Sequence, residues 1–129
     1  MGVSQSNNSR SIVGSQDNGT SIKADINWIE FYGADGMEGI IHPLNDDWMI
    51  GSVQFGGKIR TKDGGYSQDG INPSNFSGDW ITPLFYDPNE QMRIYTASDT
   101  LYRSDDFGTN WVALSNPFNN NVTHAAIAN

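Results

Sequence analysis

The sequence predicts an all-β fold built from repeated units of four short strands, and two observations carry this prediction. A Ser/Thr-x-Asp-x-Gly pattern occurs at Thr61–Gly65 and returns 43 residues later at Ser104–Gly108. Each copy follows a strand-like run that ends in arginine, at Arg60 and at Arg103. A period in the forties with four strands per repeat is typical of β-propeller blades. The predicted architecture is therefore a set of antiparallel four-stranded propeller blades.

Short β-rich runs between turn residues place the individual strands. The first repeat has three such runs, at 12–15, 20–22 and 26–31. The second has runs at 39–41, 48–53 and 57–60, and a poorly marked fourth strand near 67–70. The third is the clearest, with runs at 80–86, 93–97, 100–103 and 110–114. Residues 122–128 resemble residues 81–86, which predicts the first strand of another blade.

These runs divide the chain into approximate blades at 1–32, 33–78 and 79–118, with the start of another blade at 119–129. A length of 129 residues allows about three blades, the outer ones incomplete. Propellers close with about 4–8 blades. We therefore expect the chain to be part of a longer propeller, or to pair with other copies, because open blade edges favour association.

Composition excludes several classes of function. The net charge is −8, from 15 acidic and 7 basic residues, so a phosphate-binding face for nucleic acid is not expected. No apolar run approaches the roughly 18–20 residues of a membrane span. The absence of cysteine removes disulfides and thiolate metal sites. The first residues lack the basic and apolar regions of a signal peptide. No cofactor is expected.

The two turn motifs resemble those of the Asp-box, or BNR, repeat family of propellers. This family includes sialidases, xyloglucan-degrading glycosidases and the luminal domain of sortilin. The likeness extends over nearly the whole chain and is greatest to large secreted bacterial members, which implies a secreted or cell-surface location. Ser15–Gly19 also fits the pattern, but its alignment with the other repeats places it one turn earlier in its blade.

The motif residues are expected to stabilise turns. Glycine allows a positive φ, and the Asp and Ser/Thr side chains can accept hydrogen bonds from backbone amides. Catalysis or calcium binding by the two aspartates is the alternative. The structural set comprises Thr61, Asp63, Gly65, Ser104, Asp106, Gly108 and Trp111.

Ligand-binding residues are expected on the opposite face. In a four-stranded blade, second-to-third strand turns and inter-blade connections emerge together, and the resemblance places family active sites there. Acidic and amide groups beside aromatic rings suit carbohydrate, and a protein ligand is also possible. The alternative is that the polar groups only form turns and that Phe55 and Trp80 pack between blades. The candidate residues are Asp17, Asn18, Asp35, Glu38, Gln54, Asp79, Trp80 and Asp99.

We favour a non-catalytic binding or scaffold segment over a fragment of a glycoside hydrolase. In the second case Asp35, which has glycines at 33, 36 and 39 around it, is the candidate for one of two catalytic carboxylates. An inverting pair would stand about 6.5–9.5 Å apart, and the pKa of one partner would be raised. His42 and His124 lie too far apart in repeat phase for a zinc site. Arg60 and Arg103 fall on the wrong face for a sialidase-like arginine cluster.

Overall fold

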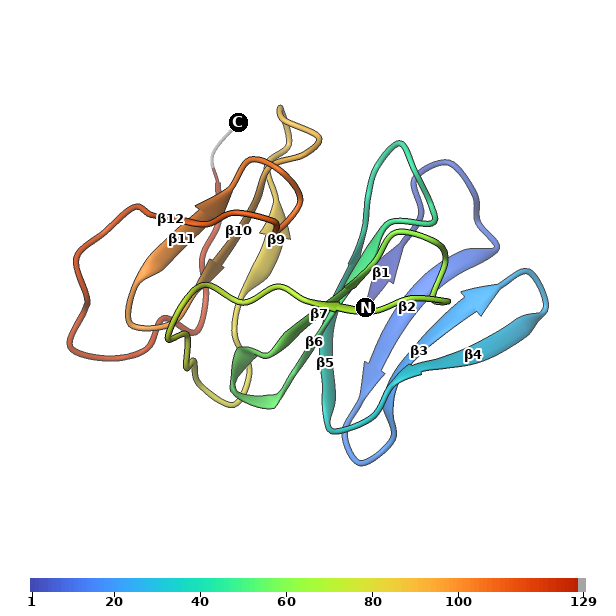
Figure 1. The fold of residues 1–129 in the computed structure, drawn as a ribbon, viewed down its shortest axis with the longest axis horizontal. Helices are drawn as coiled ribbons and strands as arrows, with labels where there is room; N and C mark the ends of the chain where they lie inside the picture. Colours follow the sequence, from blue (N-terminus) through green and yellow to red (C-terminus); the bar gives the residue numbers. More distant parts are fainter. Residues whose placement is uncertain (128–129) are drawn as a thin grey trace.

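The computed structural model describes residues 1–127, and they form three antiparallel sheets of four strands each. The sheets stand side by side in chain order, so that the middle sheet lies between the other two (Figure 1). The fold is all-β, as predicted. We call the sheets blades 1, 2 and 3. Their strands are β1 Gly2–Val3, β2 Arg10–Ser15, β3 Gly19–Ala24, β4 Asn27–Tyr32, β5 Gly36–Ile41, β6 Met49–Val53, β7 Lys58–Thr61, β8 Asp69–Gly70, β9 Leu84–Tyr86, β10 Ile94–Ala97, β11 Leu101–Ser104 and β12 Val112–Ala113.

Three strand predictions need correction. The sequence pattern missed β1, because a two-residue strand is too short to show alternation, and with β1 the first blade has four strands rather than being incomplete. The predicted strand 80–86 begins only at Leu84. Pro83 has no backbone N–H with which to extend the ladder. Trp80 consequently lies in the connection before β9. The strand predicted at 122–128 is also wrong, because residues 119–127 form no strand, and the rest of the predicted blade start at 119–129 lies outside the described residues. A single 3₁₀ turn at Gln54–Gly56 separates β6 from β7.

Two apolar layers hold the blades together. Between blades 1 and 2 the buried side chains are Ile12, Ile22, Phe31, Ile41 and Met49. Between blades 2 and 3 they are Ile40, Ile50, Ile71, Leu84, Ile94 and Phe107. Neighbouring residues Ile40 and Ile41 therefore point to opposite faces of β5. Because both faces are covered, β5 and β6 have buried apolar residues at consecutive positions, as at Ile40-Ile41 and Met49-Ile50.

The two Ser/Thr-x-Asp-x-Gly turns, which we call Asp-box turns after the motif they resemble, have equivalent geometry and connect the third strand to the fourth in blades 2 and 3. In blade 3, Ser104 Oγ donates to Asp106 Oδ1 at 2.8 Å and accepts from Gly108 N at 2.8 Å. Asp106 Oδ1 also accepts from Asn110 N at 2.8 Å. Gly108 has φ +89°, and a Cβ there would stand 2.5 Å from Ile71 of the preceding blade. This glycine is thus required both by the backbone conformation and by the close packing of blades.

The blade 2 turn repeats these contacts. Thr61 Oγ1 donates to Asp63 Oδ1 at 2.8 Å and accepts from Gly65 N at 2.9 Å, while Ser67 N donates to Asp63 Oδ1 at 2.8 Å. Hydrogen bonds from Ser67 and Thr61 lower the pKa of Asp63 to about 2. Trp111 is half-buried, and its Nε1 donates to Ile71 O at 2.6 Å across the blade boundary. Ser15–Gly19 instead forms the β2–β3 turn, one turn earlier in its blade, as its alignment predicted.

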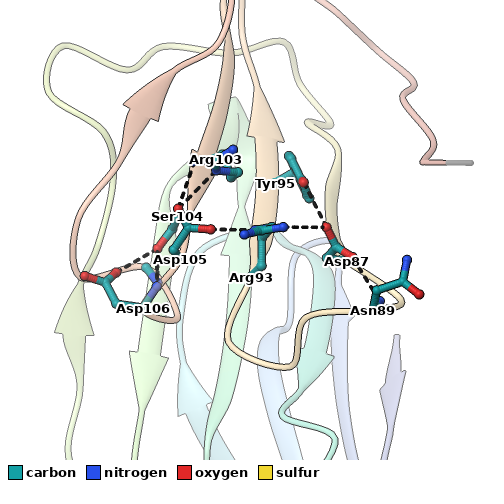
Figure 2. Close-up of polar contacts among 9 residues, drawn as sticks. Asp87, Asn89, Arg93, Tyr95, Arg103, Ser104, Asp105 and Asp106 are labelled. Atoms are coloured by element: carbon teal, nitrogen blue, oxygen red, sulfur yellow. Dashed lines mark hydrogen bonds and ion pairs between the residues drawn. The ribbon is translucent and has the colours of Figure 1, made fainter. Parts of the chain in front are cut away.

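First-to-second strand turns lie on the same face as the Asp-box turns. In blade 3, Arg93 links the β9–β10 turn to the Asp-box turn, because it pairs with both Asp87 and Asp105 (Figure 2). Its hydrogen bond to Asp105 is the main cause of its raised pKa. Arg103 pairs with the same Asp105 at 3.0 Å. The arginines therefore stabilise this face, away from the candidate ligand-binding residues.

Candidate functional site: the connection face

The face opposite the Asp-box turns, which we call the connection face, brings together the β2–β3 turn, the β4–β5 connection, the β6–β7 turn and the β8–β9 connection. Asp17 N donates to Asp35 Oδ1 at 2.7 Å, which joins the first two. Asp35 N donates to Gln54 Oε1 at 3.1 Å, and Gln54 N donates to Asp35 O at 3.2 Å. Three of the predicted residues, from three different segments, therefore form one hydrogen-bonded group.

Asp35 lies at the centre of this group. One of its carboxylate oxygens accepts a backbone N–H, and its own backbone is held on both sides by Gln54. The preceding residues leave open space, since Gly33 is exposed and a Cβ there would meet nothing within 4 Å. The contacts give Asp35 a positioning role between blades 1 and 2.

Phe55 and Trp80 form an exposed aromatic pair beside this group. Their ring centroids are 5.3 Å apart with the planes at 89°, and the residues are 55% and 38% exposed. Backbone bonds fix the pair: Phe55 N donates to Trp80 O at 3.3 Å, and Gly78 N donates to Phe55 O at 3.0 Å. Instead of packing between blades, as the alternative reading of the sequence had it, the two rings present apolar surface to solvent.

Two neighbouring hollows share Ile81, Thr123 and His124, and Trp80 of the aromatic pair lines one of them. One, of about 260 Å³, is lined by Asp79 and Trp80 as well as by the shared residues. The other, of about 240 Å³, is lined by the shared residues and by Glu38, Thr82, Pro83, Leu84, Phe85 and Ala125. Each hollow is lined by one carboxylate, Glu38 in one and Asp79 in the other. Three predicted residues, Glu38, Asp79 and Trp80, therefore line these two adjoining hollows. Pockets for small ligands typically measure about 300–1,000 Å³, so each hollow has room for only part of a drug-sized molecule.

The remaining predicted residues, Asn18 and Asp99, line neither hollow. Asn18 Nδ2 donates to Gln16 O within its own turn at 3.2 Å. Asp99 Oδ1 accepts from Thr100 Oγ1 at 2.9 Å, also within its own turn. Both side chains make the local contacts by which Asn and Asp stabilise turns.

The sequence pattern did not place His124 and Thr123 at this surface. They reach it because the C-terminal segment is bonded to the β10–β11 turn, where Phe118 N donates to Asp99 O at 2.6 Å and Val122 N to Ser98 O at 2.8 Å. Such contacts depend on the path of an irregular segment, which has no periodic pattern in the sequence.

Within residues 1–127, no three side chains of the metal-binding types gather into a group that could hold an ion. The same residues contain no helix with the length and apolarity needed to cross a bilayer.

Comparison with solved structures shows the fold. The chain is similar to the crystal structure of an ancestral GH74 enzyme, with a TM-score of 0.69 and 18% sequence identity over 89% of this chain. This chain spans 18% of the length of that enzyme. No family model matches the sequence, and no curated protein matches it. The fold and the connection face thus define a segment of β-propeller blades with an acidic, aromatic surface between blades 2 and 3.

Proposed function

We propose that the chain is a non-catalytic binding segment of an Asp-box propeller and that its connection face binds glycan. The observation that carries the proposal is the exposed Phe55–Trp80 pair, whose Trp80 lines a hollow with the carboxylate of Asp79, next to a second hollow that contains the carboxylate of Glu38. Exposed rings give flat apolar surface for the C–H faces of a sugar, and carboxylates accept hydrogen bonds from its hydroxyl groups. The proposed setting is secreted or cell-surface, where polysaccharides are accessible.

Trp80 is expected to contribute most of the contact area. Its backbone is bonded to Phe55, and Asp79 Oδ1 accepts from Trp80 N at 2.7 Å, so the ring stands on a pre-ordered loop. A pre-ordered aromatic side chain loses little entropy on binding.

The test is binding of the full chain to a polysaccharide array, followed by titration of the best ligand with Trp80→Ala. Burying a large aromatic side chain is worth about 1.5–3 kcal/mol, so we expect affinity to fall roughly tenfold to a hundredfold. The control is Trp28→Ala, which removes an indole that is 57% exposed on β4, outside the connection face. Equal effects of the two substitutions would contradict the proposal.

The second candidate function is a segment of a glycoside hydrolase, and the likeness to a GH74 enzyme favours it. Asp35 would then act as one of two carboxylates across a cleft. Its bond from Asp17 N supports a positioning role instead. A hydrolysis screen with the same polysaccharides separates the two functions. Turnover that Asp35→Asn abolishes would replace the binding proposal, whereas binding without turnover would support it.

A further inference from the structure

The outer face of blade 3 has side chains at the same ladder positions as the face of blade 2 that packs against blade 3. On blade 2 this face is a row across the sheet, in which Ile40 pairs with Ile50, Ile50 with Arg60, and Arg60 with Asp69, followed by Ile71. On blade 3 the same ladder positions belong to a second row. Its members are Phe85, Tyr95, Arg103, Val112 and Leu114, so Val112 stands where blade 2 has Asp69.

The blade 2 row shows what these positions do when a blade covers them. Its three isoleucines are buried against Leu84, Ile94 and Phe107 of blade 3. Arg60 Nη1 donates to Phe107 O at 2.9 Å and to Thr109 Oγ1 at 2.8 Å, and both acceptors belong to the Asp-box turn of blade 3. The row therefore recognises an Asp-box turn by apolar contact and by a charge-assisted hydrogen bond.

Among residues 1–127, no sheet packs on the blade 3 row. Leu114 is 43% exposed, whereas its counterpart Ile71 is 6% exposed. The Arg103 side chain is 33% exposed, against 9% for Arg60, and its guanidinium is bonded to Asp105 of its own blade. The apolar positions and the cationic donor are thus present without a neighbouring sheet (Figure 2 shows Tyr95 and Arg103).

The path of the C-terminal segment agrees with this equivalence. Between blades 2 and 3 the connection is fixed where Gly78 N donates to Phe55 O. After blade 3 the matching bond is made by Val122 N to Ser98 O. Residues 123–125 then run beside β9, where they line a hollow with Pro83 and Phe85.

We propose that the row Phe85, Tyr95, Arg103, Val112 and Leu114 is a docking surface for a further four-stranded blade that carries a Ser/Thr-x-Asp-x-Gly turn. The glycine of that turn would sit against Leu114, and the carbonyl before it would accept a hydrogen bond from Arg103. Blade 1 of a second copy fits less well, because its β3–β4 turn is Asp25-Ile26 and lacks the glycine that close packing requires.

The probe is a tandem chain in which residues 1–122 are followed by a second copy of residues 79–127, so that Val122 takes the place of Gly78 and the added blade continues in repeat phase. In the tandem, we expect Arg103→Ala to lower the urea midpoint as much as Arg60→Ala lowers it in the original chain. In the original chain, Arg103→Ala should shift the midpoint by much less, because the Arg103 guanidinium there pairs with Asp105 of its own blade rather than with a neighbouring blade. Hydrogen exchange at the Leu114 amide should be slower in the tandem than in the original chain.

Replacing the added copy's equivalent of Gly108 with Leu is the second variant, and it should return the Leu114 amide to its original exchange rate. Unchanged exchange at Leu114 in the tandem, or an equally small effect of Arg103→Ala in both chains, would overturn the proposal. A concentration-dependent dimer of the original chain that Leu114→Asp abolishes would also overturn it, because a second copy would then be the occupant.

Discussion

Among single residues, Lys58 has the most unusual environment. Its side chain is 1% exposed, its Nζ donates to Gly56 O at 2.7 Å, and the same nitrogen lies 3.7 Å from the centre of the Phe76 ring. Burial lowers the pKa of Lys58 from 10.5 to about 7. A lysine is tolerated here because its Nζ donates to a carbonyl of the β6–β7 turn and lies over the Phe76 ring of the β8–β9 connection.

Lys58 should make stability depend on pH between about 7 and 10.5. Because its folded pKa lies below its unfolded pKa, the unfolded chain binds more protons in this range, so the free energy of unfolding rises with pH. The difference in urea midpoint between Lys58→Met and the original chain should accordingly change across this range. Lys62→Met, which removes an exposed lysine, is the control. Parallel curves for all three proteins would exclude a depressed lysine pKa.

At the scale of elements, the Asp-box turns are stabilised by hydrogen bonds from backbone N–H groups to the Ser/Thr hydroxyl and the Asp carboxylate. The same hydrogen bonds occur in both turns. In blade 3, burial alone would raise the pKa of Asp106, but hydrogen bonds from Asn110 and Ser104 outweigh it and the net pKa is lowered. In blade 2 the pKa of Asp63 is lowered to about 2. Both turns therefore favour ionised aspartate, which agrees with a role in turn stability.

Asp63→Ala should destabilise the chain at neutral pH, and the difference from the original chain should shrink in acid. A carboxylate with a depressed pKa adds stability that is present above its unfolded pKa of 3.8 and is lost as the pH falls towards 2. Thermal unfolding from pH 7 to pH 2 measures this. Glu90→Ala, which removes an exposed carboxylate from the β9–β10 turn, should show no comparable dependence. A constant difference for Asp63→Ala would contradict the turn role.

At the scale of the whole molecule, blade 2 is the only described blade with a neighbour on each face. Arg60 adds a buried hydrogen bond to blade 3, and Arg10 pairs with Asp47 at 2.6 Å across the boundary of blades 1 and 2. Stability should therefore be greatest in the middle of the array, as nearest-neighbour packing of repeats implies.

Native-state hydrogen exchange should follow this order. We expect the amides of β6 and β7 to exchange most slowly, because their opening requires the loss of both apolar layers. The amides of β12, at an uncovered sheet edge, should exchange fastest among the strands. Ile50→Ala should accelerate exchange in blades 2 and 3 more than in blade 1, since Ile50 belongs to the layer between blades 2 and 3. Uniform exchange over all strands would indicate that the three blades open as one unit.

The fold class, the repeat and the positions of the two Asp-box turns could be predicted from the amino-acid sequence. These features depend on local physics: strands alternate with period two, and a turn with positive φ needs glycine after a capping aspartate. The equivalence of Thr61–Gly65 and Ser104–Gly108 followed from spacing alone. The sequence also grouped Asp17, Asp35 and Gln54 on one face, because strand order fixes the end of a sheet at which each turn emerges.

Only the tertiary structure decided which of the candidate residues lie together. Asp35 accepts a backbone N–H of Asp17, Trp80 and Phe55 form an exposed pair, and His124 reaches the hollow. These contacts depend on irregular connections, and the path of an irregular segment is set by long-range hydrogen bonds rather than by a local period. The exposure of the blade 3 row also could not be predicted from a local pattern. Its residues occupy the same positions in their blade as the buried blade 2 row, and the two rows differ because no sheet of residues 1–127 packs on the blade 3 row.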